Sequence, residues 1–211
     1  MGLNLRVLGR PLFESGLIIF SVLFALFVNR CAENQRIEEQ KEVALERIVE
    51  ELKSNRELIK DVMQVHREAV ANLRRASTDE NDSLRLYLAR ERFFDQEALG
   101  FLISGRSFFP SFPSSTSWNA AKSTAIIAEF DYEIVEALTK VYTTQEFFSE
   151  KTLTYIIQII YSPVTEDERD TINALLLQTS ELISQEEFTL QNIEEALEVI
   201  EGGEKDSSRE H

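Results

Sequence analysis

Residues 32–76 read AENQRIEEQKEVALERIVEELKSNRELIKDVMQVHREAVANLRRA and contain neither proline nor glycine. Apolar residues recur along this stretch at spacings of three and four, a heptad pattern over about four repeats that predicts one long α-helix. Further apolar residues widen the apolar face, which favours a helical bundle over a two-stranded coiled coil. The pattern leaves open whether this stripe packs within one chain or between two chains. The stripe comprises Leu45, Ile48, Leu52, Asn55, Ile59, Val62, His66, Ala69 and Leu73.

Two members of the stripe are polar. We interpret Asn55 as a residue that fixes the packing register or stays partly solvated. We interpret His66 as a hydrogen-bonded side chain at the margin of the bundle. The alternative makes His66 a candidate pH-responsive residue, because a half-buried imidazole can change its charge near neutral pH.

An apolar segment precedes the long helix, and it predicts a transmembrane anchor at residues 12–30 that binds the lipid bilayer. Glu14 is its only ionisable residue before Arg30. As a helix, about 20 residues span roughly 30 Å, which is close to the thickness of the hydrocarbon layer. Residues 1–11 then form an N-terminal tail. The later apolar run at 152–162 is too short to span a bilayer, so we expect a single transmembrane segment.

Two other interpretations of this segment are weaker. A cleavable signal peptide needs small residues three and one positions before the cut, and Val28-Asn29-Arg30 does not supply them. A lipoprotein signal places a small residue before the lipidated cysteine, whereas Arg30 precedes Cys31. The sequence therefore favours a retained anchor. Basic residues do not favour either orientation strongly, but the short tail before the anchor favours a cytoplasmic amino terminus and a C-terminal domain outside the cytoplasm.

Residues 105–117, GRSFFPSFPSSTS, predict a loop rich in proline, serine and phenylalanine. This loop is interpreted either as a lid that packs on the core or as an exposed aromatic site that docks a partner. The tryptophan that follows it is interpreted either as a core anchor or as a ring that stacks on a ligand. The candidate interaction residues are Phe108, Phe109, Phe112 and Trp118.

Three further helices are predicted after this loop, at about 118–129, 131–161 and 166–200. Pro163 ends the second of them, and Thr165 with Glu168 forms a capping-box pattern at the start of the third. Gly202-Gly203 predicts the end of that helix, and residues 202–211 are expected to be a disordered tail. The predicted fold is all-α, with the anchor continuing into a long helix that packs with the later helices as an antiparallel bundle over residues 31–201.

The composition argues against several kinds of chemistry. A net charge of −15 disfavours nucleic acid, whose binding depends on lysine and arginine. With two histidines and one cysteine, a site for a metal or a cofactor is not expected, and no phosphate-loop, dinucleotide, zinc-protease or hydrolase motif is present. Adjacent carboxylates, such as Glu186-Glu187, are interpreted as solvated helix faces. We therefore expect no enzymatic activity and no catalytic residue.

Two stretches resemble a known family. One is the apolar segment that leads through Ala25-Leu26-Phe27-Val28-Asn29 into a Glu-rich helix, and the other is Ser117-Trp118-Asn119-Ala120-Ala121-Lys122-Ser123-Thr124. Together they resemble a family of uncharacterised bacterial single-pass inner-membrane proteins whose anchor ends in an Ala-Leu-x-x-Asn pattern. Family anchors usually continue Asn-Trp, and here Arg30 and Cys31 occupy those places. The resemblance implies an uncleaved anchor in the bacterial inner membrane, with a domain that is then periplasmic, and it implies no assigned chemistry.

Two classes of function are compatible with these patterns. One is a membrane-anchored interaction or scaffold protein that binds another membrane or envelope protein. The other is an extracytoplasmic ligand-sensing module that signals through a partner membrane protein. The heptad pattern also continues backwards from Leu45 into the anchor, although Asn34, Glu38 and Lys41 interrupt it. It predicts a parallel homodimer, in which Cys31 would be a candidate intermolecular disulfide in an oxidising compartment.

Overall fold

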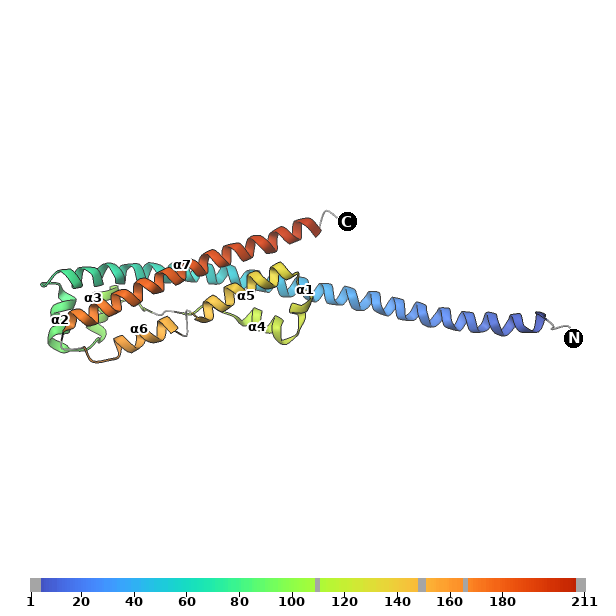
Figure 1. Cartoon of the computed structure of the whole chain (residues 1–211), viewed down its shortest axis with the longest axis horizontal. Helices are drawn as coiled ribbons and strands as arrows, with labels where there is room; N and C mark the ends of the chain where they lie inside the picture. Colours follow the sequence, from blue (N-terminus) through green and yellow to red (C-terminus); the bar gives the residue numbers. More distant parts are fainter. Residues whose placement is uncertain (1–4, 109–110, 148–150, 165–166, 208–211) are drawn as a thin grey trace.

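The protein is an elongated assembly of helices in which the first helix extends far beyond the others (Figure 1). The structure, a computed structural model, describes the backbone of residues 5–108, 111–147, 151–164 and 167–207, and the side chains from residue 17 to residue 202 within these ranges. Every regular element in these ranges is helical, and none is a strand. The predicted all-α fold is therefore confirmed.

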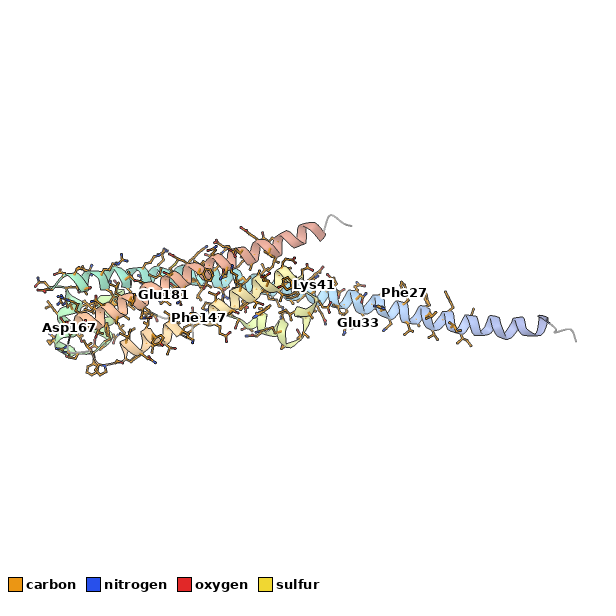
Figure 2. The ribbon with its side chains drawn as sticks, in the orientation of Figure 1. Phe27, Glu33, Lys41, Phe147, Asp167 and Glu181 are labelled. Carbon is orange, nitrogen blue, oxygen red and sulfur yellow. The ribbon has the colours of Figure 1, made fainter. Side chains whose placement is uncertain are left out.

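Helix α1 (Leu5–Thr78) runs without a break through the apolar segment and the heptad stripe. Its 74 residues correspond to about 110 Å. Phe27 and Glu33 lie on the part of α1 that extends beyond the bundle, and Lys41 lies where the bundle begins (Figure 2). All nine stripe residues are buried by later segments of the same chain, so the stripe packs within the chain. The predicted tail at 1–11 is helical from Leu5 onward, because a proline removes only one helical hydrogen bond and apolar helices tolerate it.

Two short helices, α2 (Ser83–Glu91) and α3 (Gln96–Ile103), follow at the far end of α1. Asp82 and Asp95 cap their amino ends by accepting hydrogen bonds from backbone N–H groups of the first turn. Arg92 and Ser104 end them in the left-handed conformation, with φ of 64° and 51°. The left-handed residues at the ends of α2 and α3 change the direction of the chain sharply.

The segment predicted as one helix at 118–129 is divided into two. Helix α4 (Thr116–Ser123) ends before Ala125, whose left-handed backbone (φ 59°) starts the short 3₁₀ helix η1 (Ile126–Glu129). A left-handed residue cannot continue an α-helix, so the prediction of an unbroken helix is wrong at this point.

The helix predicted at 131–161 is also divided, into α5 (Tyr132–Phe147) and α6 (Leu153–Ile160). Lys151 and Thr152 form part of a π-helical turn before α6, and residues 148–150 lie outside the described ranges. The apolar faces of α5 and α6 belong to different core clusters, and one straight helix would not bury both.

Helix α7 (Glu168–Ser207) returns antiparallel along α1 (Figure 1). It continues through Gly202-Gly203, where the sequence predicts a stop, and the predicted tail is therefore helical as far as Ser207. A Cβ atom added at Gly202 would meet nothing within 4 Å, so this glycine marks neither a turn nor a close contact.

Buried apolar side chains form two separate clusters. The distal core lies at the end of the bundle away from the N-terminal part of α1, and the proximal core lies next to that part. The distal core comprises Val65, Ala69, Leu73, Ala76, Leu84, Tyr87, Leu88, Phe94, Ala98, Leu102, Ile103, Phe108, Leu153, Ile156, Ile160, Val164, Ile172, Leu175 and Leu182. The proximal core comprises Leu45, Ile48, Leu52, Ile59, Trp118, Ala121, Phe130, Ile134, Leu138, Val141, Tyr142, Ile193, Ala196, Leu197 and Ile200.

Six of the buried polar side chains lie near the places where the chain passes from one core to the other. On α7, three of them lie between Leu182 of the distal core and Ile193 of the proximal core. Others end α5 and precede α6, and one lies on α1 beside Val65. We call this set the polar belt; it comprises His66, Gln145, Thr152, Glu186, Thr189 and Asn192.

Candidate functional site on the long helix

The aromatic residues after α3 are placed differently from one another. Phe108 and Trp118 are buried in the distal and proximal cores, respectively. Phe112 is 54% exposed, whereas Phe109 lies outside the described residues. Of the three candidate interaction residues that the structure describes, Phe112 is therefore exposed to solvent, whereas Phe108 and Trp118 pack in the cores.

Residue Asn55 of α1 holds the backbone of this loop with both ends of its amide. Its Nδ2 donates to the Ser114 carbonyl oxygen at 2.7 Å, and its Oδ1 accepts from the Ser114 N–H at 2.8 Å. Asn55 is buried, and both its amide nitrogen and its amide oxygen bond to the loop. The contact tethers α1 to a segment 59 residues away.

One turn earlier on α1, the buried carboxylate of Glu51 accepts three hydrogen bonds. Its Oε2 receives the Ser114 hydroxyl at 2.9 Å and the Ser117 N–H at 2.8 Å, and its Oε1 receives the Tyr142 hydroxyl at 2.7 Å. Burial, together with the Glu51 carboxylate, raises the pKa of Tyr142 above its ordinary range. Glu51 therefore joins α1, the start of α4 and α5 in one contact.

The rings of Trp118 and Tyr142 stack beside this carboxylate, with centroids 5.2 Å apart and planes 2° from parallel. The Lys122 ammonium lies 5.5 Å from the Trp118 ring centroid. Trp118 thus acts as a core anchor between α4 and α5. A surface groove of about 600 Å³ runs beside the stack and is lined mostly by polar side chains of α4 and α5.

His66 lies inside the bundle, not at its margin as the sequence suggested. Its side chain is fully buried, Nδ1 lies 2.8 Å from Glu186 Oε1 of α7, and Nε2 lies 3.0 Å from the Phe108 carbonyl oxygen. The rings of His66 and Phe108 also pack together, with centroids 4.6 Å apart. The pH response predicted for His66 stays a prediction.

Glu186 corrects the interpretation of Glu186-Glu187 as a solvated pair. Glu186 is 2% exposed, whereas the side chain of Glu187 is 57% exposed and pairs with Arg67 at 2.8 Å. Burial raises the pKa of the Glu186 carboxyl, and the contact with His66 opposes that rise. Adjacent glutamates on one helix therefore have opposite environments.

The apolar N-terminal part of α1 extends away from the bundle (Figure 1). Its described side chains from Leu17 to Arg30 are exposed, and α1 is the one described helix that is long and apolar enough to cross a membrane. A signal sequence would meet the same criterion of length and composition. Cys31 follows this part and is a free, exposed cysteine.

A second groove, of about 660 Å³, lies between α1 and α4 at the proximal end of the bundle. Apolar side chains line it from α1 (Val43), from α4 (Ala121) and from the start of η1 (Ile126), and Arg36 and Arg47 of α1 flank them. Within the described residues, no three histidine, cysteine, aspartate or glutamate side chains are grouped so that they could hold a metal ion. The contacts described above position the loop and the helix faces around it.

Sequence reasoning missed four residues of these contact networks, namely Glu51, Ser114, Tyr142 and Glu186. A signal for Glu186 exists, because the apolar stripe of α7 skips from Ile183 to Leu190 and leaves one turn without an apolar member. Glu51 directly precedes Leu52 of the α1 stripe, and this position lies at the edge of the buried face. No family model, curated protein or solved structure matches this chain.

Proposed function

We propose that this protein is a membrane-anchored helical interaction or scaffold protein of the bacterial envelope, without catalytic activity. The observation that carries the proposal is the continuity of α1. Its exposed apolar part and its buried stripe belong to one unbroken helix, so the bundle is rigidly mounted on the anchor. The resemblance to single-pass inner-membrane proteins points in the same direction.

The loop after α3 is the surface that we assign to a partner. Asn55 and Glu51 fix its backbone, which leaves the exposed ring of Phe112 on a rigid support. Exposed aromatic side chains on a rigid support are typical anchors of protein interfaces. The expected partner is a membrane or envelope protein.

A pull-down in mild detergent tests this assignment. We expect a stoichiometric membrane protein to co-purify with the wild-type protein and to be lost with Phe112→Ser. Leu177→Ser is the matched control, because Leu177 is also exposed, at 66%, but lies on α7. A monodisperse protein without a partner, whose melting temperature rises with small metabolites, would instead support the ligand-sensing module.

Membrane topology is a separate test. If the bundle is periplasmic, a reporter enzyme that works only outside the cytoplasm will be active when fused after His211. A reporter that works only in the cytoplasm will then be inactive. A cytoplasmic reporter signal would overturn the proposed location, and it would also remove the oxidising environment that a Cys31 disulfide requires.

A parallel homodimer through the anchor is the proposed oligomer. Cys31 is exposed and follows the apolar part of α1 directly, so two copies would bring their thiols together. We expect a dimer band on non-reducing gels after oxidation, and we expect Cys31→Ser to abolish it. An identical band pattern in the two proteins would contradict the dimer.

A further inference from the structure

His66 of α1 connects α7 to the backbone of the segment that follows α3. Its two ring nitrogens contact two different groups, the Glu186 carboxyl at 2.8 Å and the Phe108 carbonyl oxygen at 3.0 Å. His66 is 0% and Glu186 2% exposed, so neither contact competes with bulk solvent. Residues 105–108 are held against α1 partly through this histidine.

The two contacts determine how many protons the pair holds. A carbonyl oxygen can only accept, so Nε2 must carry a hydrogen when it bonds to Phe108. The contact between Nδ1 and Glu186 Oε1 then needs one more proton between them, either on the imidazole or on the carboxyl. A neutral histidine beside an ionised glutamate would place two lone pairs face to face at 2.8 Å.

The other carboxyl oxygen, Glu186 Oε2, is buried and has no hydrogen-bond partner among the described residues. An unpartnered oxygen is less costly on a neutral carboxylic acid than on a carboxylate, because burying a charge costs more than burying a dipole. Burial also raises the pKa of Glu186. Both observations favour the state in which the pair keeps its extra proton.

Other charged groups near the pair are already matched with one another. Arg67 and Glu187 pair across the same two helices on the surface, and Glu68 pairs with Arg106 of the loop. From α6, Leu153 lines the small cavity of about 20 Å³ next to the pair and contributes no charge. The charges of Arg67 and Glu187 act on the Glu186 carboxyl with opposite signs, so they oppose each other.

We propose that His66, Glu186 and the Phe108 carbonyl form a proton-dependent latch that holds residues 105–108 on α1 and opens when the shared proton is lost to solvent at alkaline pH. Opening separates Nδ1 from the carboxylate and withdraws Phe108 from the distal core. The latch goes beyond the proposed scaffold role, because it makes the loop next to the partner surface responsive to pH.

The direction of the pH effect follows from the proton count. A free glutamate and a free histidine titrate near pH 4.3 and about 6.5, so above about pH 6.5 the open pair holds no extra proton. The closed pair holds one, so opening releases a proton and rising pH favours the open state. The opening equilibrium is expected to shift by up to about tenfold per pH unit until the closed pair itself loses the proton.

Hydrogen exchange on the full chain in detergent micelles tests the latch. After correction for the intrinsic exchange rate, protection of residues 105–108 in the wild-type protein should fall several-fold from about pH 6.5 to about pH 9. Residues 114–117, which Asn55 and Glu51 hold, serve as the internal reference and should keep their protection.

The Glu186→Gln variant distinguishes a contact that depends on the shared proton from a contact that is only structural. The glutamine amide can donate to Nδ1 without an extra proton, so protection of residues 105–108 should persist to high pH. Glu187→Gln removes the same charge one position away on the exposed face and should keep the wild-type pH profile. The proposal is overturned by a flat wild-type profile, by equal profiles in wild type and Glu186→Gln, or by a Glu186→Gln protein that does not fold.

Discussion

The two halves of the bundle bury their apolar residues by different means. The distal core is closed by three short helices, α2, α3 and α6, of eight or nine residues each. The proximal core is formed mainly by α1, α5 and α7, with Trp118 stacked on Tyr142. The distal half therefore depends on helix caps and tight turns, whereas the proximal half depends on long helices and on the Glu51 contacts across them. The polar belt lies between the distal and the proximal half.

The first prediction asks whether the two halves unfold together. Leu52→Ala in the proximal core and Leu88→Ala in the distal core each remove a fully buried side chain and should each lower the free energy of unfolding by about 2–5 kcal/mol. Since α1 and α7 run through both cores, urea unfolding should be one transition for circular dichroism and for the fluorescence of Trp118, the single tryptophan.

The fluorescence of Trp118 reports only on the proximal half, whereas Leu88→Ala destabilises the distal half. This variant therefore tests whether the two halves are coupled. A shift of the Trp118 transition equal to the shift in circular dichroism supports one cooperative unit. A Trp118 transition that stays at its wild-type position would show that the halves unfold separately.

The second prediction concerns the contacts that are special to the proximal half. Glu51→Ala leaves the Tyr142 hydroxyl and the Ser117 N–H without their acceptor and should lower the free energy of unfolding by about 1–3 kcal/mol. Glu50→Ala, on the exposed face of α1, should change stability little. Chemical unfolding of both variants measures this, and equal effects would contradict the role of Glu51.

The third prediction concerns the caps that are special to the distal half. Asp82 accepts the Leu84 N–H at 2.9 Å and is buried at the start of α2. Asp82→Ala should cost about 0.5–2 kcal/mol, whereas Asp82→Asn keeps a capping oxygen and should cost less. Thermal unfolding distinguishes the two, and an asparagine variant as unstable as the alanine variant would argue against capping.

The smallest expected effect is a gain of stability. A Cβ atom at Gly100, inside α3, meets nothing within 4 Å, so Gly100→Ala should stabilise the protein by about 0.5–1 kcal/mol. Gly105 has a φ of +76°, and Gly105→Ala should destabilise it. Melting temperatures that move in the same direction for both variants would show that backbone conformation is not the cause.

Local periodicity explains which parts of the fold could be predicted. The α1 stripe repeats every three to four residues, and all nine of its members are buried as expected. The helix breaks at Ala125 and before Leu153 have weaker local signals in the sequence. The break before Leu153 lets the apolar faces of α5 and α6 pack in different cores. Gly202-Gly203 resembles a helix stop in sequence, yet α7 continues past it.

Pairing between distant residues explains what could not be predicted of the site. Glu51 meets Ser114 over a separation of 63 residues, and Glu186 meets His66 over 120 residues. A carboxylate on a helix usually faces water, so the gap in the α7 stripe and the edge position of Glu51 do not by themselves identify a buried carboxylate without its distant partner. The polar character of Asn55 and His66 was visible in the stripe, and the loop at 105–117 was predicted, but the contacts between them were not.

The exposed stretch of α1 has a mechanical consequence. About 15 residues separate Arg30 from Leu45, the first member of the stripe, and as continuous helix they correspond to about 22 Å. Each residue inserted there would raise the bundle by about 1.5 Å and turn it by about 100° around the helix axis. A deletion of seven residues would therefore lower the bundle by about 10 Å while nearly keeping its bearing, whereas a deletion of two would point the Phe112 face in almost the opposite direction. Under the proposed membrane anchoring, residues 31–44 therefore set both the distance of the bundle from the bilayer and its rotation about the helix axis.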